Sequence, residues 1–353
     1  MAHLPPAVAE TPLFLQLQEH LPLYSRGKVR DTFELPGHPE LLLVVASDRV
    51  SIFDYVLNAQ VWAKGIILNL LSCSWMRSGG VLAGIPNHLV AMGRDIDQFL
   101  KPEPLRGIPD LRARGVVVRK LNIVLIECVV RGYLTGSGWR DYKKTGAICG
   151  IKLPPGLQEG CKLPTGYFPL FTPTSKATSG HDKPLNARVV MRQYPELARL
   201  SIRCYKAIHD AAAKRGFIFA DTKFEFGSVD GVDGYVLADE VGTPDSSRFW
   251  DFPGWEKSQT ANPPKSPPGW DKEPVRKWGT TVETPFGVTG INNLDPITQE
   301  YLTFVDELEV PVEVVNSCSR RYQDAFRRLQ SRDFSTFLDS RHNIRLPART
   351  VAM

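Results

Sequence analysis

Side chains able to do acid–base or metal chemistry are concentrated in the segment Asp221-Thr-Lys-Phe-Glu-Phe-Gly227. Successive side chains of a strand point to opposite faces, so Asp221, Lys223 and Glu225 are expected to share one face. The next apolar run ends in Asp239-Glu240 and would bring more carboxylates alongside. Carboxylates removed from water need a cation or protons, and magnesium is a hard cation that one or two carboxylates, water and phosphate oxygens can hold. The alternative is the solvated face of an exposed strand.

A second candidate site follows a predicted strand that ends at Arg131. Three glycines at positions 132, 136 and 138 surround Thr135 and Ser137 before a helix is expected to begin. A glycine-containing loop that opens a helix presents backbone N–H groups to an anion. The spacing matches neither a P-loop nor the dinucleotide fingerprint. The simpler interpretation is a tight turn with a serine cap.

Two further segments carry arginines in predicted turns. Arg248 stands in the segment Thr243–Trp250, where its guanidinium could fork onto a carboxylate or phosphate. A capped turn that starts a helix is the simpler interpretation of that segment. The segment Arg26–Arg30 could clamp phosphates, with a basic surface hairpin as its alternative. The pair His181–Asp182 is more typical of a structural contact than of catalysis.

Periodicity predicts the elements that must position these residues. Helices are predicted over residues 13–21, 64–76, 195–215 and 312–329, and strands over 41–46, 116–119, 123–130, 217–226 and 235–241. Residues 227–234 are expected to form a long hairpin loop, and residues 252–270 to be irregular. Strands cluster early and helices late, which favours an α+β fold over a regular βαβ alternation.

Composition restricts the class of protein. The chain has 353 residues, is 42% hydrophobic and 23% charged, and carries a net charge of +5, which is typical of a globule with a sizeable core. It has no run of five like charges that would indicate a nucleic-acid-binding tail. Its six cysteines are scattered, and no targeting pattern or apolar run near the roughly 20 residues that span a bilayer is visible. We expect a cytoplasmic protein that binds neither nucleic acid nor membrane.

Seven segments together resemble the SAICAR synthetase (phosphoribosylaminoimidazole-succinocarboxamide synthase) family. They are RGKVRDTF, ASDRVSIFD, IECVVRGYLTGSGW, GIKLPPGLQE, FTPTSKATSGHD, ADTKFEFG and ADEVGTPDSSRFW, in the family's order. The resemblance implies an ATP-dependent ligase of purine biosynthesis that uses ATP and Mg²⁺. Such an enzyme condenses carboxyaminoimidazole ribonucleotide with L-aspartate through an acyl phosphate, giving SAICAR, ADP and phosphate.

The resemblance also implies site residues, position by position. Nucleotide contacts fall on Gly27, Lys28, Arg30, Ile123 and Lys176, and metal contacts on Glu225 and Asp239. Substrate contacts fall on Ser47, Asp48, Arg49, Arg131, Ser137, Asp221, Asp245, Arg248, Lys272 and Arg276. Catalytic roles are implied for Lys28, Arg131, Asp221, Lys223 and Arg248. Two departures stand out: Leu125 replaces a proline usual in the family, and Trp62-Ala-Lys-Gly65 replaces a common PGKG.

The fold that the resemblance implies is a two-lobed SAICAR synthetase-like α+β fold with ATP in the cleft. Residues 1–19 would form an N-terminal arm, residues 20–122 a smaller, antiparallel β-rich nucleotide-binding lobe, and residues 123–353 a larger α+β lobe with the metal and substrate sites, the C-terminal helix and a tail. A monomer or small homo-oligomer is expected. Two alternatives stay open: another ATP-dependent phosphotransferase, which would not need Arg131 and Asp245, and a catalytically silent nucleotide-binding protein.

Overall fold

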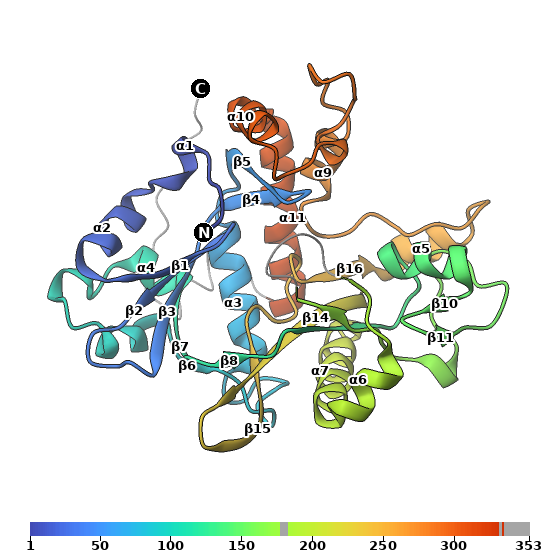
Figure 1. Ribbon diagram of the computed structural model, residues 1–353, viewed down its shortest axis with the longest axis horizontal. Helices are drawn as coiled ribbons and strands as arrows, with labels where there is room; N and C mark the ends of the chain where they lie inside the picture. The colour runs from blue at the N-terminus through green and yellow to red at the C-terminus, as the bar shows by residue number, and fades with distance from the viewer. Residues whose placement is uncertain (177–182, 332–333, 335–353) are drawn as a thin grey trace. The chain divides into compact units, whose positions relative to one another are not determined.

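Two large antiparallel sheets organise the chain, each in its own unit of the computed structural model (Figure 1). The structure describes residues 1–176, 183–331 and 334. Unit 1 comprises Met1–Leu70, Leu89–Lys120 and Asp271–Met353, and unit 2 comprises Leu71–His88 and Leu121–Trp270. The sequence-based division differs, because it groups residues 71–88 with the first lobe and residues 271–353 with the second lobe.

The sheet of unit 1 has the strand order β1-β2-β3-β7-β6. Its strands are β1 (Leu23–Arg26), β2 (Arg30–Glu34), β3 (Leu41–Ala46), β6 (Leu89–Met92) and β7 (Gly115–Arg119). Helix α2 (Pro12–His20) begins where the Thr11 hydroxyl accepts a hydrogen bond from the backbone N–H of Phe14. Phe14 and Leu17 of this helix join Phe33 and Leu43 of the sheet in one buried core, so the N-terminal segment is anchored by apolar burial.

The remaining elements of unit 1 surround this sheet. They are α1 (Pro6–Ala9), β4 (Arg49–Ile52), β5 (Tyr55–Gln60), the 3₁₀ turns η1 (Gly93–Phe99) and η2 (Glu103–Leu105), α4 (Pro109–Arg114), α9 (Glu273–Gly279), η4 (Ile291–Asn293), α10 (Gln299–Glu307) and α11 (Val312–Gln330). Helix α3 (Lys64–Met76) contributes residues to both units.

The C-terminal helices belong to unit 1 because they pack on its hairpin β4–β5. Helix α9 contacts β4, and α10 contacts β5. The approach is close: a Cβ atom at Gly279 would lie 2.5 Å from Cδ1 of Ile52. The Ser319 hydroxyl of α11 donates to the carbonyl of Trp62 over 3.1 Å. These long-range contacts explain why the order of segments along the chain does not predict the division into units.

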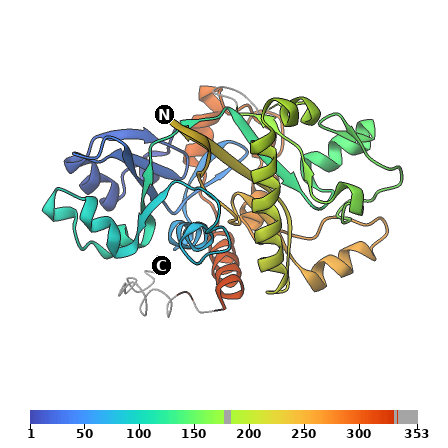
Figure 2. The same ribbon diagram turned by 90° about the horizontal axis from the view of Figure 1, so that it is seen from below.

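Unit 2 is built on a seven-stranded sheet with the path β12-β9-β14-β15, to which β8, β13 and β16 add at the sides. Its elements are β8 (Asn122–Ile123), β9 (Ile126–Arg131), α5 (Gly136–Thr145), β10 (Ala147–Ile148), β11 (Ile151–Lys152), η3 (Thr165–Tyr167), β12 (Leu170–Phe171), β13 (Thr174–Ser175), α6 (Ala187–Gln193), α7 (Pro195–Ala213), β14 (Phe217–Val229), β15 (Val232–Ala238), β16 (Ser247–Asp251) and α8 (Phe252–Gln259). Helix α7 lies beside β14 and β9 (Figure 2), and its apolar stripe is buried there.

Strand β14 is the centre of this sheet, since it pairs with β8, β9, β15 and β16. Phe224 and Phe226 are fully buried, as the alternation of the sequence predicts. One extra residue, Ala220, interrupts the pairing with β16, where Phe219 and Asp221 face consecutive residues of the partner strand. The Ala220 carbonyl accepts from the N–H groups of Gly132 and Tyr133. This bulge re-aims the side chains that follow it, Asp221 first.

Several sequence predictions hold residue for residue, and others need correction. The α+β class is confirmed, as are the strand over 41–46 and the helix over 64–76. The predicted strand over 123–130 is two strands, β8 and β9, because both pair with β14 on either side of a break at residues 124 and 125. The predicted loop over 227–234 is wrong: β14 and β15 continue to a turn at Asp230 and Gly231, where Gly231 has a φ of 73°.

Two further corrections concern residues 243–270. The turn expected around Arg248 leads into strand β16, because Arg248 pairs with Asp221 in the ladder. The region expected to be irregular contains helix α8, which the Asp251 side chain caps by accepting from the N–H of Gly254. The pair His181–Asp182 and the predicted tail (332–333 and 335–353) lie outside the described residues.

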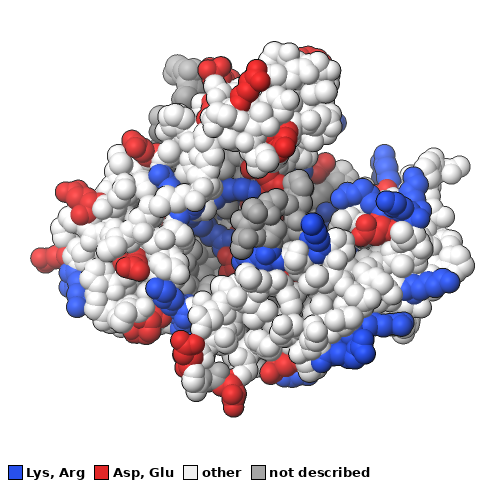
Figure 3. Space-filling view, in the orientation of Figure 1, with Lys and Arg blue, Asp and Glu red and all other residues white. Residues whose placement is uncertain are grey.

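Basic side chains gather on the part of unit 2 that carries α5 and α8 in the view of Figure 1 (Figure 3). Helix α5 exposes Arg140, Lys143 and Lys144, and the two lysines lie in its last turn, where they suit the negative end of the helix dipole. Among the described helices, none has the length and apolar character that crossing a membrane demands.

Candidate active site

The polar face of β14 in unit 2 carries a strip of carboxylates and lysines. The Lys223 ammonium donates to Oε1 of Glu127 on β9 at 2.6 Å and lies 3.4 Å from Oε1 of Glu225. Lys176 donates to the other oxygen of Glu225. Lys223 and Glu225 thus share one face, as alternation along the strand predicts. We call Glu127, Glu225 and Asp239, with these two lysines, the carboxylate strip.

Asp239 joins the strip through the pairing of β14 with β15. Glu225 lies opposite Ala238, the last residue of β15, and Asp239 follows with a φ of 59°. Sequence analysis expects Asp239 inside a strand, but it stands just past the strand end in a left-handed conformation. Aspartate adopts that conformation more readily than most residues, and strain of this kind clusters at functional sites.

Electrostatics link the members of the strip. Burial by itself would lower the pKa of Lys223, but Glu225, Glu127 and Asp239 together raise that pKa above its ordinary value. The strip thus combines three carboxylates with two ammonium groups on one side of the sheet. In the part of the chain that is described, no three His, Cys, Asp or Glu side chains form a ready-made metal cage.

A second cluster lies on the same strand, around the carboxylate of Asp221. Arg131 of β9 donates to Oδ2 of Asp221 at 2.5 Å, and Arg248 of β16 donates to the same oxygen. Arg131 also donates to the hydroxyls of Ser137 at 2.9 Å and of Thr172 at 3.1 Å. Burial lowers the pKa of Arg131, and the charge of Asp221 opposes that effect. We call Arg131 and Arg248 the arginine pair.

The arginine pair lies against the N-terminus of α5, which the glycine pattern predicts. A Cβ atom at Gly136 would be 2.5 Å from Nη2 of Arg248, and one at Gly138 would be 3.1 Å from Cδ of Arg131. Gly136 also has a φ of 58°. The glycines are therefore needed because two guanidinium groups approach the backbone here. Backbone N–H groups at a helix start, together with guanidinium groups, are suited to bind an anion.

The two arginines differ in their exposure. Arg131 has 7% of its side chain exposed, whereas Arg248 has 39%. In the described residues, Asp221 is the one protein acceptor of the Arg248 guanidinium. Arg248 therefore presents N–H groups toward solvent, while Arg131 is held in place by three side chains.

Unit 1 positions the turn Gly27–Arg30, which the sequence assigns to phosphates. Lys28 forms an ion pair of 2.5 Å with Asp54, with both side chains close to half exposed. Arg49 is fully buried, and its guanidinium binds Asp31 and the backbone of the turn. The resemblance groups Arg49 with the substrate residues, yet its guanidinium is occupied by protein groups.

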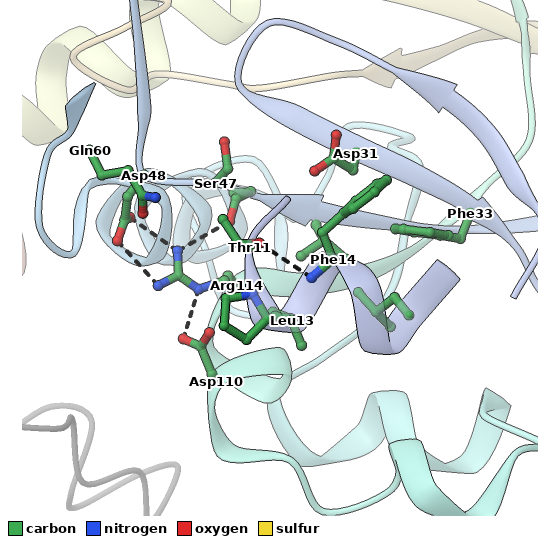
Figure 4. A pocket seen from close by; sticks show the side chains of 14 residues that line it. Thr11, Leu13, Phe14, Asp31, Phe33, Ser47, Asp48, Gln60, Asp110 and Arg114 are labelled. Atoms are coloured by element: carbon green, nitrogen blue, oxygen red, sulfur yellow. Dashed lines mark hydrogen bonds and ion pairs between the residues drawn. The ribbon is translucent and has the colours of Figure 1, made fainter. Parts of the chain in front are cut away.

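Ser47 and Asp48 are also engaged inside unit 1. Ser47 donates its hydroxyl to the carbonyl of Val29, and Asp48 accepts from the N–H of Gly65 at 2.8 Å and from Arg114. Figure 4 shows both residues at the edge of a cavity of about 250 Å³, which α2, β2, β3 and α4 line. Arg114 bridges Asp48 and Asp110 across it, and the carboxylates raise the pKa of Arg114 although burial alone would lower it.

The other predicted residues stand apart from these clusters. Ile123 in β8 pairs with Gly227 of β14, and its side chain is exposed. Asp245 is half-buried in the turn before β16. Arg276 of α9 binds Asp271 at 2.8 Å in unit 1, and Lys272 occupies the N-cap position of the same helix without a capping hydrogen bond from its side chain. Glu127 joins the carboxylate strip although the sequence motifs assign it no role. Its position inside an apolar run is the signal in the sequence, and the next residue, Cys128, pairs with Phe224 of β14.

Comparison with known proteins agrees with the resemblance. The family model described as SAICAR synthetase matches residues 23–289. Curated proteins named phosphoribosylaminoimidazole-succinocarboxamide synthase from Bordetella petrii and Thermodesulfovibrio yellowstonii are 41% and 40% identical, each over 88% of this chain and 95% of the relative. The solved SAICAR synthase of Saccharomyces cerevisiae complexed with SAICAR is 32% identical, with a TM-score of 0.73 over 93% of this chain and 99% of that chain.

Proposed function

This chain belongs to the SAICAR synthetase family, and we propose that the carboxylate strip and the arginine pair form the reaction site of its ligase activity. That activity is that of a phosphoribosylaminoimidazole-succinocarboxamide synthase in purine biosynthesis, an ATP-dependent ligase. One observation carries our assignment of the site. Asp221 and Glu225 lie four positions apart on one face of β14. Asp221 pairs with two arginines, and Glu225 pairs with two lysines.

The reaction that we assign to this site proceeds in two steps. A carboxylate is a poor acyl donor, because oxide would have to leave. Its oxygen therefore attacks the γ-phosphorus of ATP, the bond to the β–γ bridging oxygen breaks, and ADP leaves. The amine of aspartate then attacks the acyl carbon, phosphate leaves with the former carboxyl oxygen, and the nitrogen loses a proton. Catalysis of such steps rests on positioning and on offsetting charge.

We assign the phosphates of ATP to the turn that carries Lys28 and Arg30, and the adenine to the neighbourhood of Ile123. The support for Lys28 is its exposed pair with Asp54, because an exposed ion pair contributes little stability and can exchange partners. Lys176 is assigned to the nucleotide as well. Its side chain is about one-third exposed and holds Glu225, so it can follow the charge that a triphosphate brings.

Magnesium is proposed at Glu225 and Asp239. Its fit is argued from donor chemistry: Glu225 and Asp239 offer hard carboxylate oxygens, and magnesium needs only one or two protein carboxylates when water and phosphate oxygens complete its shell. When bound, the ion offsets the negative charge of the phosphates. Lys223 keeps the carboxylates of Glu127 and Glu225 from repelling each other across the strands.

The ribonucleotide and aspartate are assigned to the arginine pair and the start of α5. Arg248 offers N–H groups to a carboxylate or phosphate, and Ser137 is exposed beside it. Arg131 orients Ser137 and Asp221, and we place Asp245 on the same side. Lys272, Arg276, Ser47 and Asp48 are assigned to substrate binding from the family motif alone. A cytoplasmic location fits the six free cysteines, and a monomer or small homo-oligomer stays our prediction.

An isotope experiment tests the proposed chemistry. The protein is incubated with ATP labelled by ¹⁸O in the β–γ bridge, magnesium and the carboxylated ribonucleotide, with aspartate omitted. An acyl phosphate that forms reversibly moves the label to a non-bridging β-oxygen, and adding aspartate then yields the succinocarboxamide. Transfer of phosphate to some other acceptor would favour a different phosphotransferase, and binding without turnover a silent protein.

A further inference from the structure

A buried arginine controls the geometry of the turn that carries Lys28. Arg49 is fully buried, and its Nη1 and Nη2 donate to the two oxygens of Asp31, each at 2.9 Å. Its Nε donates to the carbonyl of Lys28 at 3.0 Å, and Nη2 donates to the carbonyl of Gly27 at 3.1 Å. One guanidinium therefore fastens a buried carboxylate and two consecutive carbonyls of the turn.

Neighbouring groups complete this clamp on the turn. The N–H of Gly27 donates to the carbonyl of Arg30 at 2.8 Å, and a Cβ atom at Gly27 would lie 3.2 Å from that oxygen. Ser47 donates its N–H and its hydroxyl to the carbonyl of Val29, at 2.9 Å and 2.8 Å. Residues 47–49 thus hold the carbonyls of residues 27, 28 and 29 from one side.

The clamp holds the backbone and leaves the lysine side chain outside. The Lys28 side chain is 43% exposed, whereas the Arg49 side chain is 1% exposed. A planar fork with five N–H donors can serve Asp31 and both carbonyls together, and an ammonium group cannot. Rigid placement matters because a displacement of about 1 Å can cost on the order of a hundredfold in rate.

We propose that Arg49 is a positioning residue: it sets the turn Gly27–Arg30 so that Lys28 meets the phosphates of ATP, and it does not touch the ribonucleotide or aspartate. The inference rests on the proposed function, in which Lys28 binds phosphate. Arg49 thereby affects the affinity for ATP although its buried side chain does not contact the nucleotide.

The first experiment measures Michaelis constants in Arg49→Lys, which keeps a positive charge beside Asp31. We expect the KM for ATP to rise about tenfold, as expected for two lost backbone hydrogen bonds, with unchanged KM values for the ribonucleotide and aspartate. The matched control is Arg112→Lys, which weakens the ion pair with Asp97 elsewhere in unit 1 and should leave all three constants unchanged. A rise in the KM for the ribonucleotide instead of ATP would overturn the proposal.

A second comparison separates positioning from simple loss of stability. In a Lys28→Met background, Arg49→Lys should add less than twofold to the KM for ATP, because the side chain that it positions is already gone. Full additivity of the two effects contradicts the proposal. If Arg49→Lys does not fold, the pair Arg49→Gln with Asp31→Asn removes both charges of the Arg49–Asp31 ion pair, leaves Arg26 in place, and should raise the KM for ATP in the same way.

Hydrogen exchange without nucleotide distinguishes failure of this inference from failure of the proposed function. The amides of Gly27 and Ser47 should exchange at least about tenfold faster in Arg49→Lys and at the wild-type rate in Arg112→Lys. Unchanged exchange in Arg49→Lys refutes the clamp. A Lys28→Met variant with wild-type KM for ATP refutes the phosphate assignment, and the exchange rates then still decide whether Arg49 holds the turn.

Discussion

Each unit buries one aspartate between two arginines, but the surroundings of the arginines differ. In unit 1, Asp31 is 4% exposed and pairs with Arg49 and Arg26. In unit 2, Asp221 is 5% exposed and pairs with Arg131 and Arg248. Burial lowers the pKa of Arg26 in unit 1 and the pKa of Arg131 in unit 2.

The difference lies in what the remaining N–H groups of the arginines contact. Arg26 stacks on the ring of Phe14 at 3.6 Å and donates to the carbonyl of Ala9, so its guanidinium contacts protein groups. Arg248 is more than one-third exposed and lies against Gly136 at the start of α5. The same ionic arrangement therefore makes a structural clamp in one unit and a candidate anion site in the other. The difference in role follows from the exposure of the Arg248 side chain, which is greater than that of Arg26.

The largest expected effect comes from Arg131→Met. This change leaves the buried carboxylate of Asp221 short of one partner and loosens Ser137, so the free energy of unfolding should fall by about 3–5 kcal/mol. We expect kcat/KM to fall about a thousandfold. Urea denaturation and steady-state kinetics measure the two effects. The control is Arg26→Met, which should lower stability but keep kcat/KM for the ribonucleotide and for aspartate within a few-fold. An equal loss of activity toward these two substrates would show that the two clusters do not differ in function.

Next in size is Glu225→Gln. The amide keeps the volume of the side chain and removes the charge that Lys176 and Lys223 contact, and turnover should fall at least about a hundredfold. Turnover at saturating ATP, magnesium and substrates measures this loss. Glu34→Gln is the matched control at an exposed position of unit 1, and it should behave as wild type. Near-normal turnover of the Glu225 variant would remove this residue from the metal site.

A smaller effect is expected for Arg248→Lys. Lysine retains the charge beside Asp221 but cannot fork onto a carboxylate, so kcat/KM should fall about tenfold to a hundredfold. Stability should change by less than about 1 kcal/mol, because the ion pair is partly exposed. The substrate whose KM rises should be the ribonucleotide or aspartate. A change confined to the KM for ATP, as expected for Arg49→Lys, would contradict the assignment of Arg248 to the ribonucleotide and aspartate.

The smallest effect concerns alkaline pH and compares β9 and α7 of unit 2 with β5 of unit 1. Burial raises the pKa of the Cys128 and Cys204 thiols of unit 2 from 9.0 to about 12, and that of Tyr55 in unit 1 from 10.0 to about 12. A raised pKa in the folded state gives stability that is complete below the unfolded pKa and is lost as pH rises. Each group contributes at most about 1.4 kcal/mol per pH unit.

Strand β9 and helix α7 should therefore lose protection from about pH 9, and strand β5 from about pH 10. Hydrogen exchange, corrected for the intrinsic rate and read for peptides of β9, α7 and β5, measures the two onsets. Cys204→Ala should make the loss in α7 less steep. A common onset in both units would show that the buried thiols do not control the response.

Local patterns predicted much of the fold and part of the site. Strand β3 and helix α3 were predicted residue for residue, since an apolar run and a helical stripe are encoded within the segments themselves. The shared face of Lys223 and Glu225 follows from the period of two in a strand. The glycines at 136 and 138 indicated a loop that opens a helix, but not that the guanidinium groups of Arg131 and Arg248 approach it.

Tertiary structure decided the rest, because it depends on partners distant in sequence. Ala220 forms a bulge only where β9 and β16 meet β14, and helices α9–α11 join unit 1 through packing on β4 and β5. Glu127 gained a place in the site from strand register. Arg49 and Arg248 have the same side chain and the same kind of partner, yet their roles diverge with burial. The sequence by itself determined which groups could carry charge. Their water exposure, and hence their chemistry, arose from long-range packing.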